Sequence, residues 1–310
     1  MKIAFIFPGQ GSQSVGMARD FIENFPEARS VFETASSVLG FDLAALCVNG
    51  PAERLNLTEN TQPAILAASM AVLRVIEAQG LAAEAAAGHS LGEYTAITAA
   101  GGFDLADAVA LVRKRGRYMQ EAVPPGVGLM AAILGMERDA VEKTCLDASK
   151  NGIVGPANYN SPGQIVIAGE KKAVEAAMEL ARAAGAKRVV PLAVSVPSHC
   201  AMMKDAGERL ARELDQVAIR DLRIPIVNNA DARFLRTAAE LKPSLVRQIS
   251  SSLYWEDSIN AMTAEGFDTF IELGPGKVLS GLVKRIAKDA KVLNVEDRKS
   301  LGETLQALEG

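Results

Sequence analysis

The sequence predicts an α/β protein in which a mostly parallel sheet is covered by helices on both faces and a small ferredoxin-like subdomain is inserted. Short apolar runs alternate with longer amphipathic stretches along almost the whole chain, which is the pattern of parallel β-α-β units. One internal segment instead follows the order β-α-β-β-α-β, which is typical of the ferredoxin-like arrangement. The length of 310 residues suits two domain units, or one large domain with an insertion.

The large domain is predicted from elements at both ends of the chain. Apolar runs predict strands at 3–7, 224–229, 267–273 and 291–295. Amphipathic stretches predict helices at 61–79, 104–122, 202–217 and 276–288. The N-terminal run is followed by a Pro-Gly loop and not by a small-residue cleavage site, so we interpret it as a strand and not as a signal peptide.

The inserted subdomain is predicted from the middle of the chain. Its strands are expected at 128–135, 152–158, 164–169 and 187–192, and its helices at 137–150 and 171–185. The stretch "NSPG" (160–163) has the composition of a hairpin turn. "VPPG" (123–126) marks the start of the subdomain, and the stretch from Pro191 to Pro197 marks its end. We therefore assign 125–195 to the small subdomain, and 1–124 with 196–310 to the large domain.

Composition narrows the functional class. Hydrophobic residues make up 49% and charged residues 23%, as in ordinary globular proteins. A net charge of −4 argues against nucleic-acid binding, and no apolar run reaches the roughly 18 residues that span a bilayer. The three cysteines are far apart and form no C-x-x-C pair, which predicts reduced thiols in a cytoplasm and no zinc site.

The stretch "GHSLG" (88–92) has the G-x-S-x-G spacing of a nucleophile elbow. In such an elbow the serine occupies a tight strand-to-helix turn, for which Gly88 and Gly92 leave room. The following residues predict a helix, whose N-terminal dipole and free N–H groups would face the oxygen of Ser90. Because this short pattern also occurs by chance, a plain glycine-rich turn is the alternative interpretation.

A nucleophilic serine needs a base, and the chain has only two histidines. His89 directly precedes Ser90, so its side chain should point elsewhere, and His199 is the remaining candidate base. No acid of a triad is evident, and a backbone carbonyl is the alternative means of orienting the imidazole. Four aspartates lie downstream without a motif: Asp205, Asp215, Asp221 and Asp231.

Arg115 lies on the apolar face of its predicted helix. Four apolar neighbours occupy positions three and four residues away: Leu111, Val112, Tyr118 and Met119. Arg113 and Arg117 point to the other side, so we expect Arg115 to be at least partly buried. A buried guanidinium without an anion costs several kcal/mol, on the order of magnitude known for broken buried ion pairs. Its partner is either a structural carboxylate or a carboxylate of the substrate, and both remain open.

Several stretches, taken together, resemble one family along the whole chain. They are "FPGQGSQ" (7–13), "TQPAI" (61–65), "GHSLGEY" (88–94), "RGRYMQ" (115–120), "NYNSPGQIVIAG" (158–169), "VPSHC" (196–200), "RQISSSLYW" (247–255) and "ELGPGKVLSGL" (272–282). In this order they resemble the malonyl-CoA:acyl carrier protein transacylases of fatty acid synthesis, in the form of the discrete bacterial enzyme. The resemblance implies that the large domain is α/β-hydrolase-like.

The resemblance also implies roles for individual residues. Ser90 would be the nucleophile and His199 its base, with the backbone carbonyl of Gln248 steering the imidazole in place of an acid. Arg115 would bind the free carboxylate of the malonyl group. The remaining implied site residues are Gln10 and Leu91, whose backbone N–H groups would form the oxyanion hole, and Asn160 and Gln62 as further substrate-binding candidates. Asn160 is the weaker inference, since its stretch is also explained as a hairpin turn.

The implied reaction is ping-pong transfer of malonyl from malonyl-CoA to the phosphopantetheine thiol of acyl carrier protein through a malonyl-serine. It requires no metal and no bound cofactor, because coenzyme A enters as the substrate thioester and phosphopantetheine arrives on the carrier. The partners implied are malonyl-CoA and acyl carrier protein, with no nucleic acid and no membrane. A cytoplasmic monomer is expected.

Three other functions are weighed against this one. A serine esterase or thioesterase would use the same elbow and histidine, but its acid should lie between them in sequence and it needs no buried arginine. A nucleotide-binding module is weakly indicated, since "GQGSQS" has Ser14 for the third glycine and "GPGK" has Ile271 for the first P-loop glycine. An inert carrier-binding protein would have no need for serine, histidine and arginine together.

Overall fold

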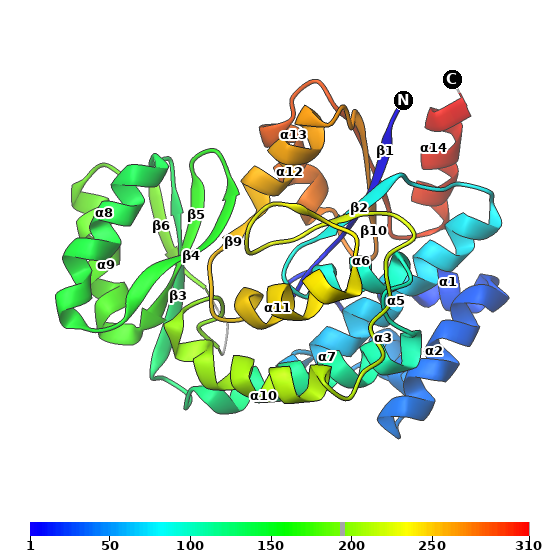
Figure 1. Ribbon diagram of the computed structural model, residues 1–310, viewed down its shortest axis with the longest axis horizontal. Coiled ribbons are helices and arrows are strands. Elements are labelled where there is room, and N and C mark those ends of the chain that lie inside the picture. The colour runs from blue at the N-terminus through cyan, green and yellow to red at the C-terminus, as the bar shows by residue number, and fades with distance from the viewer. Residues whose placement is uncertain (193–195, 310) are drawn as a thin grey trace.

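Two β-sheets, set apart from each other, organise the protein (Figure 1). The computed structural model describes residues 1–192 and 196–309. The predicted end of the insertion at residue 195 therefore lies outside the described residues, and the domain boundaries stay a prediction. The larger sheet carries most of the helices, whereas the smaller sheet lies to one side (Figure 1).

The larger sheet has six strands in the order β11-β10-β1-β2-β7-β8. All neighbours pair in parallel except β8, which runs antiparallel to β7 at the edge. The strands are β1 (Ile3–Phe7), β2 (Ala85–Gly88), β7 (Ile226–Val227), β8 (Phe234–Leu235), β10 (Thr269–Leu273) and β11 (Lys291–Val295). This mostly parallel sheet confirms the predicted α/β class.

Side chains of β1 alternate between two separate apolar cores, one on each face of the sheet. Ile3, Phe5 and Phe7 belong to the larger core, and Ala4 and Ile6 to the smaller one. Because successive side chains of a strand point to opposite faces, an apolar residue at every position means that both faces are covered.

Helices cover both faces of this sheet. On the larger core they are α1 (Arg19–Asn24), α2 (Pro26–Leu39), α3 (Leu43–Asn49), α4 (Ala52–Leu55), α5 (Thr58–Ala78), α6 (Leu91–Ala99), α7 (Leu105–Ala122), α10 (Lys204–Leu214), α11 (Ala238–Gln248) and α14 (Arg298–Glu309). On the smaller core they are α12 (Trp255–Ala264) and α13 (Val278–Ile286). Among the described residues no single helix has the length and apolarity to cross a membrane, although the bent pair α2 and α3 together meets those criteria.

The smaller sheet has the predicted ferredoxin-like order with one strand added. Its strands run β6-β3-β5-β4-β9, and the first four pair antiparallel. They are β3 (Gly128–Leu134), β4 (Val154–Ser161), β5 (Gln164–Glu170), β6 (Arg188–Pro191) and β9 (Leu253–Tyr254). Helices α8 (Arg138–Ala148) and α9 (Lys171–Ala183) pack on it through a core of their own. Pro162 and Gly163 form the predicted turn between β4 and β5.

The fifth strand, β9, comes from the large domain and pairs in parallel with β4. Its Tyr254 ring stacks on Tyr159 of β4 with centroids 5.1 Å apart. Arg138 of α8 adds an ion pair to Asp257 of α12, at 2.7 Å between Nη2 and Oδ2. The small sheet is thus joined to the large domain by backbone pairing as well as by side chains.

The predicted strand at 224–229 is wrong in length, since only Ile226 and Val227 pair in the sheet. Asn228 and Asn229 leave the strand because their polar groups bond to other elements. The Asn228 side chain donates to Ser244, and the Asn229 N–H donates to Glu93. These contacts bring the end of β7 beside α6, which begins at the elbow.

Candidate active site

Ser90 occupies the tight turn between β2 and α6, with φ 54° and ψ −103°. Few non-glycine residues adopt a positive φ, and such strain costs about 1–3 kcal/mol. A Cβ added at Gly88 would lie 1.9 Å from the carbonyl of Gly92, and one at Gly92 would lie 2.0 Å from the Phe7 oxygen. Only glycine therefore fits at both positions, and the spacing G-x-S-x-G is a steric requirement of this turn.

The backbone of Ser90 is held on both sides by side chains from distant parts of the chain. Its N–H donates to Asn229 Oδ1 at 2.8 Å. Its carbonyl accepts from Gln248 Nε2, also at 2.8 Å. Asn229 follows β7 and Gln248 ends α11, so two elements of the large domain stabilise the strained residue.

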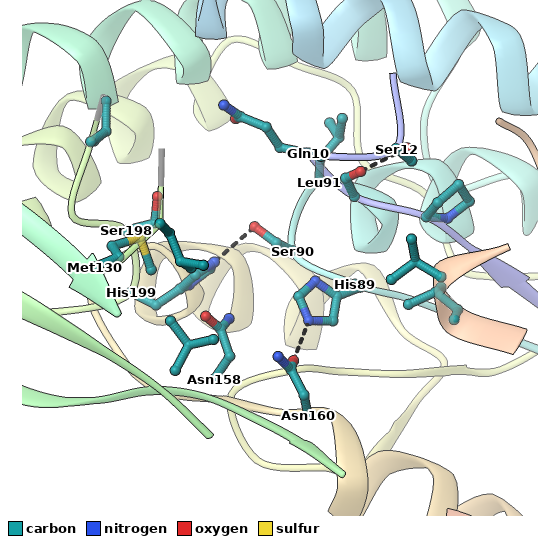
Figure 2. A pocket seen from close by; sticks show the side chains of 18 of the residues that line it. Gln10, Ser12, His89, Ser90, Leu91, Met130, Asn158, Asn160, Ser198 and His199 are labelled. Atoms are coloured by element: carbon teal, nitrogen blue, oxygen red, sulfur yellow. Dashed lines mark hydrogen bonds between the residues drawn. The ribbon is translucent and has the colours of Figure 1, made fainter. Parts of the chain in front are cut away.

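His199 lies across from Ser90, and Figure 2 shows the two side chains directed at each other. Its Nε2 is 2.8 Å from Ser90 Oγ, and its Nδ1–H donates to the backbone carbonyl of Gln248 at 2.8 Å. The Nδ1 hydrogen bond fixes the tautomer and leaves a lone pair on Nε2 facing the hydroxyl. The imidazole is 3% exposed and sits on a residue with φ 59°.

None of the four aspartates considered from the sequence bonds to His199 in the described part of the chain. Asp215 pairs with Lys242, Asp231 pairs with Arg247, and Asp221 accepts the backbone N–H of Ala238. Asp205 is exposed in the first turn of α10. The acceptor for Nδ1–H is thus a neutral carbonyl, so the imidazole is oriented without a neighbouring negative charge.

Two effects keep His199 neutral. Burial lowers its pKa to about 3, and the positive charge of Arg115 acts in the same direction. A neutral imidazole is the form that accepts a proton, so His199 is ready to act as a base across the physiological range.

Arg115 is buried as predicted, at 1% exposure. Its Nη1 donates to Gln62 Oε1 at 2.9 Å, and its Nη2 donates to Gln248 Oε1 at 3.0 Å and to Ser90 Oγ at 3.2 Å. Within the described residues these acceptors are all neutral oxygens, and no carboxylate forms an ion pair with the guanidinium. The sequence left two partners open for Arg115, and the alternative of a structural carboxylate in direct contact is therefore wrong.

The cavity beside these groups has a volume of roughly 550 Å³ and is lined by Ser90, His199 and Arg115. Gln10 and Leu91 also line this cavity, and Figure 2 shows both near Ser90. Within the described residues neither of their backbone N–H groups has a hydrogen-bonded acceptor. Two free N–H groups near the serine are the arrangement that an oxyanion hole requires.

Of the two further substrate-binding candidates, Asn160 lines the cavity and Gln62 does not. Asn160 lines the cavity and accepts a hydrogen bond from His89 Nε2 at 2.9 Å, so His89 points away from Ser90 as expected (Figure 2). Gln62 is fully buried behind Arg115 and does not line the cavity. Its contacts with the site are hydrogen bonds to Arg115 and to Met119 Sδ, so direct binding of substrate by Gln62 stays a prediction that the geometry does not favour.

Sequence reasoning missed two residues that support the turn at Ser90. Asn229 holds the N–H of Ser90, and Glu93 accepts hydrogen bonds from Asn229 and Gln248. Asn229 belongs to no motif. Glu93 lies inside the stretch "GHSLGEY", and a charged residue three positions after a nucleophile in an otherwise uncharged helix was the available signal. No group of three or more His, Cys, Asp or Glu side chains in the described residues is arranged to hold a metal ion.

An elbow serine, a neutral histidine, two free N–H groups and a buried cation in one cavity define the class of serine-dependent acyl-transfer enzymes. The sequence profile described as "Acyl transferase domain" matches residues 4–307. The chain is 51% identical over 286 residues to the malonyl CoA-acyl carrier protein transacylase of Escherichia coli K12, covering 92% of this chain and 93% of that protein. It is 47% identical over 308 residues to the Bacillus subtilis transacylase, covering 99% and 97%.

Solved structures agree with these relatives. An acyl carrier protein S-malonyltransferase from Vibrio cholerae superposes with a TM-score of 0.96 at 48% identity, covering 98% of this chain and 100% of that one. A malonyl-transacylase in complex with the carrier protein AntF gives 0.97 at 46% identity, covering 99% and 100%. The chain belongs to the acyl transferase family, among its malonyl CoA-acyl carrier protein transacylases.

Replacing His199 by Ala is expected to slow acylation of Ser90 by ~10²–10⁴, the range for losing general acid–base help. Replacing Asp205, Asp215, Asp221 or Asp231 by Ala should leave the rate of Ser90 acylation largely unchanged, because none of these aspartates orients the imidazole. Single-turnover acylation measures both. An aspartate variant as slow as His199→Ala would show that a triad acid exists.

The low pKa of His199 predicts an unusual pH profile. Since the neutral imidazole is the active form and its pKa is about 3, kcat/KM should stay flat as the pH falls from about 8 to about 5. An N-acetylcysteamine thioester of malonate is the suitable donor, because it lacks the titrating phosphates of coenzyme A. A decline with a midpoint near the ordinary histidine value of 6.5 would contradict the lowered pKa of His199.

Proposed function

We propose that Ser90 carries the malonyl group as an ester while the protein transfers it from malonyl-CoA to the phosphopantetheine thiol of acyl carrier protein. The family of the chain supports this acyl transfer. The observation that favours malonyl is the buried guanidinium of Arg115, whose Nη2 lies 3.2 Å from Ser90 Oγ and whose hydrogen-bond acceptors among the described residues are all neutral oxygens. Such a cation favours an acyl group with a carboxylate.

In the first half-reaction Ser90 Oγ attacks the thioester carbonyl carbon while His199 Nε2 takes its proton. The negative charge that develops on the carbonyl oxygen is received by the backbone N–H groups of Gln10 and Leu91. The bond from carbon to sulfur then breaks, and the imidazolium returns its proton to the leaving thiolate of coenzyme A. The product is a malonyl ester of Ser90.

In the second half-reaction the carrier's thiol gives its proton to His199 and its sulfur attacks the ester carbonyl. The same N–H groups receive the oxyanion. The bond from carbon to Oγ breaks, and Ser90 recovers its hydroxyl proton from the imidazolium. One histidine serves both halves because each begins with a neutral imidazole and a protonated nucleophile.

The partners proposed are malonyl-CoA and acyl carrier protein, following the names of the relatives and the solved complex of a malonyl-transacylase with AntF. We further propose a cytoplasmic monomer that binds neither nucleic acid nor membrane. No resident metal or cofactor takes part in the proposed steps. The domain division at 124/125 and 195/196 belongs to the same proposal.

A serine esterase or thioesterase is the rival with the same chemistry of acylation. It would release malonate to water regardless of a carrier, whereas a transacylase retains the acyl group until a thiol arrives. Incubation with malonyl-CoA, with and without holo acyl carrier protein, separates the two through the amount of free malonate. A nucleotide-binding module is tested by titration with nucleotide, for which no binding is expected.

Brief exposure to malonyl-CoA without carrier is expected to leave one malonyl adduct on Ser90, because the ester has no acceptor thiol. Intact-protein mass spectrometry and peptide mapping measure it. The Ser90→Ala variant is the control and should carry no adduct. A label on another residue, or none in a single turnover, would refute the proposal.

Arg115→Ala is expected to lower malonyl transfer by orders of magnitude while acetyl transfer holds or rises. The malonyl carboxylate would enter a desolvated site without a partner, at a cost of about 2–5 kcal/mol, and acetyl carries no such charge. Arg115→Lys should restore malonyl transfer only in part, because an ammonium lacks the planar fork. The assay compares both acyl donors and the melting temperature for each variant.

The contrary outcome for Arg115→Ala is equally specific. If Arg115 served only to stabilise the fold, both acyl donors would lose activity together and the melting temperature would fall.

A further inference from the structure

Glu93 is a fully buried acid that the proposed chemistry does not use. It lies in the first turn of α6, three residues after Ser90, and is 0% exposed. Its Oε2 accepts the backbone N–H of Asn229 and the side-chain N–H of Gln248, both at 2.9 Å. Its Oε1 has no hydrogen-bond partner among the described residues. A buried carboxyl group is costly, so its presence beside the elbow needs a physical reason.

The two partners of Glu93 are the residues that hold the backbone of Ser90. Asn229 Oδ1 accepts the N–H of Ser90, and Gln248 Nε2 donates to its carbonyl. Both backbone polar groups of the strained serine therefore depend on residues that meet at one oxygen of Glu93. Asn229 is further fixed by donating its Nδ2–H to the carbonyl of Gly88.

Gln248 also connects Glu93 with Arg115 and His199. The NH₂ end of its amide faces two acceptors, the Ser90 carbonyl and Glu93 Oε2. Its oxygen end consequently faces Arg115 Nη2, at 3.0 Å, and its backbone carbonyl accepts from His199. A reversed amide would direct donors at the guanidinium, where an acceptor is needed. The acceptors on one side thus decide which end of the amide reaches Arg115.

We propose that Glu93 is a positioning residue: as a hydrogen-bond acceptor it orients the Gln248 amide and the Asn229 loop, and through them the Ser90 backbone and Arg115. This inference rests on the proposed acyl transfer at Ser90. Burial raises the pKa of Glu93 to about 7, while hydrogen bonds from Gln248 and Asn229 act against that shift. Both protonation states keep an acceptor oxygen, so the positioning role does not depend on the charge.

The test compares Glu93→Gln, which keeps an acceptor oxygen, with Glu93→Leu, which has a similar volume and none. We expect Glu93→Gln to acylate Ser90 within about fivefold of wild type, and Glu93→Leu to be slower by ~10² or more with both malonyl-CoA and acetyl-CoA, as for a misplacement of about 1 Å. Single-turnover mass spectrometry gives the rates. Equal losses in both variants, or a Leu variant as fast as wild type, would overturn the proposal.

Glu272 supplies the matched control. It is also 0% exposed, and it accepts the backbone N–H groups of Leu279 and Ser280 at 3.1 and 2.7 Å. Glu272→Leu therefore removes the same kind of buried acceptor outside the elbow. We expect the melting temperature to fall in both Leu variants, while folded Glu272→Leu acylates Ser90 at a rate much closer to wild type than Glu93→Leu does, because Glu272 holds Leu279 at the cavity wall and does not hold the Ser90 turn. A comparable loss of rate in Glu272→Leu would overturn a specific role for Glu93.

A double-mutant cycle tests whether Glu93 acts through the Gln248 side chain. Gln248→Leu removes that side chain but keeps the backbone carbonyl that orients His199. We expect Gln248→Leu to slow acylation, and Glu93→Leu to cost less in that background than alone, because the path through Gln248 is then already lost and only the path through Asn229 remains. Full additivity of the two losses would overturn the proposal.

Two further outcomes are decisive. If Glu93→Leu does not fold, Gln248→Leu carries the test alone, and an unchanged rate in that variant overturns the proposal. If wild-type protein forms no adduct at all, the proposed acyl transfer fails; normal acylation of wild type with unaffected Glu93 variants refutes the role of Glu93 only.

Discussion

The candidate site depends on the close approach of the loop after β1 to the elbow, at glycines where no side chain is tolerated. A Cβ at Gly9 would lie 2.3 Å from the His89 carbonyl, and Cβ atoms at Gly88 and Gly92 would meet backbone within about the same distance, at 1.9 and 2.0 Å. These glycines allow the loop after β1 to pack directly against the elbow. Gln10 and Ser90 are brought into one cavity in consequence. The arrangement of the candidate catalytic groups thus depends on glycine at these positions.

The electrostatics of the cavity follow from one cation surrounded by neutral acceptors. Arg115 is buried without a carboxylate in contact among the described residues, and the nearest link to an acid runs through the amide of Gln248 to Glu93. An arginine paired directly would have its charge compensated. Because the Gln248 amide separates Arg115 from Glu93, the positive charge stays available to an anionic ligand. The same charge also helps to keep His199 neutral.

Much of this arrangement could be predicted from the sequence, because its signals are local. The elbow spacing, the apolar face around Arg115 and the elimination of His89 each need only a few neighbouring residues. Contacts such as that of Asn229 with Ser90, 139 residues apart, leave no periodic trace in the chain. Gln248 was reached only by resemblance, and β9, with two residues, is too short for any pattern to reveal.

The pairing of β9 with β4 has a consequence for how this chain can be cut and recombined. The small subdomain is predicted as one continuous stretch of sequence. Asn158 and Tyr159 of β4 nevertheless pair with Leu253 and Tyr254, about a hundred residues later by their numbering. Excising this stretch would uncover the β4 edge, and unpaired strand edges invite aggregation. An exchange of the small subdomain between related proteins would have to include β9, so the unit to be exchanged is discontinuous in sequence.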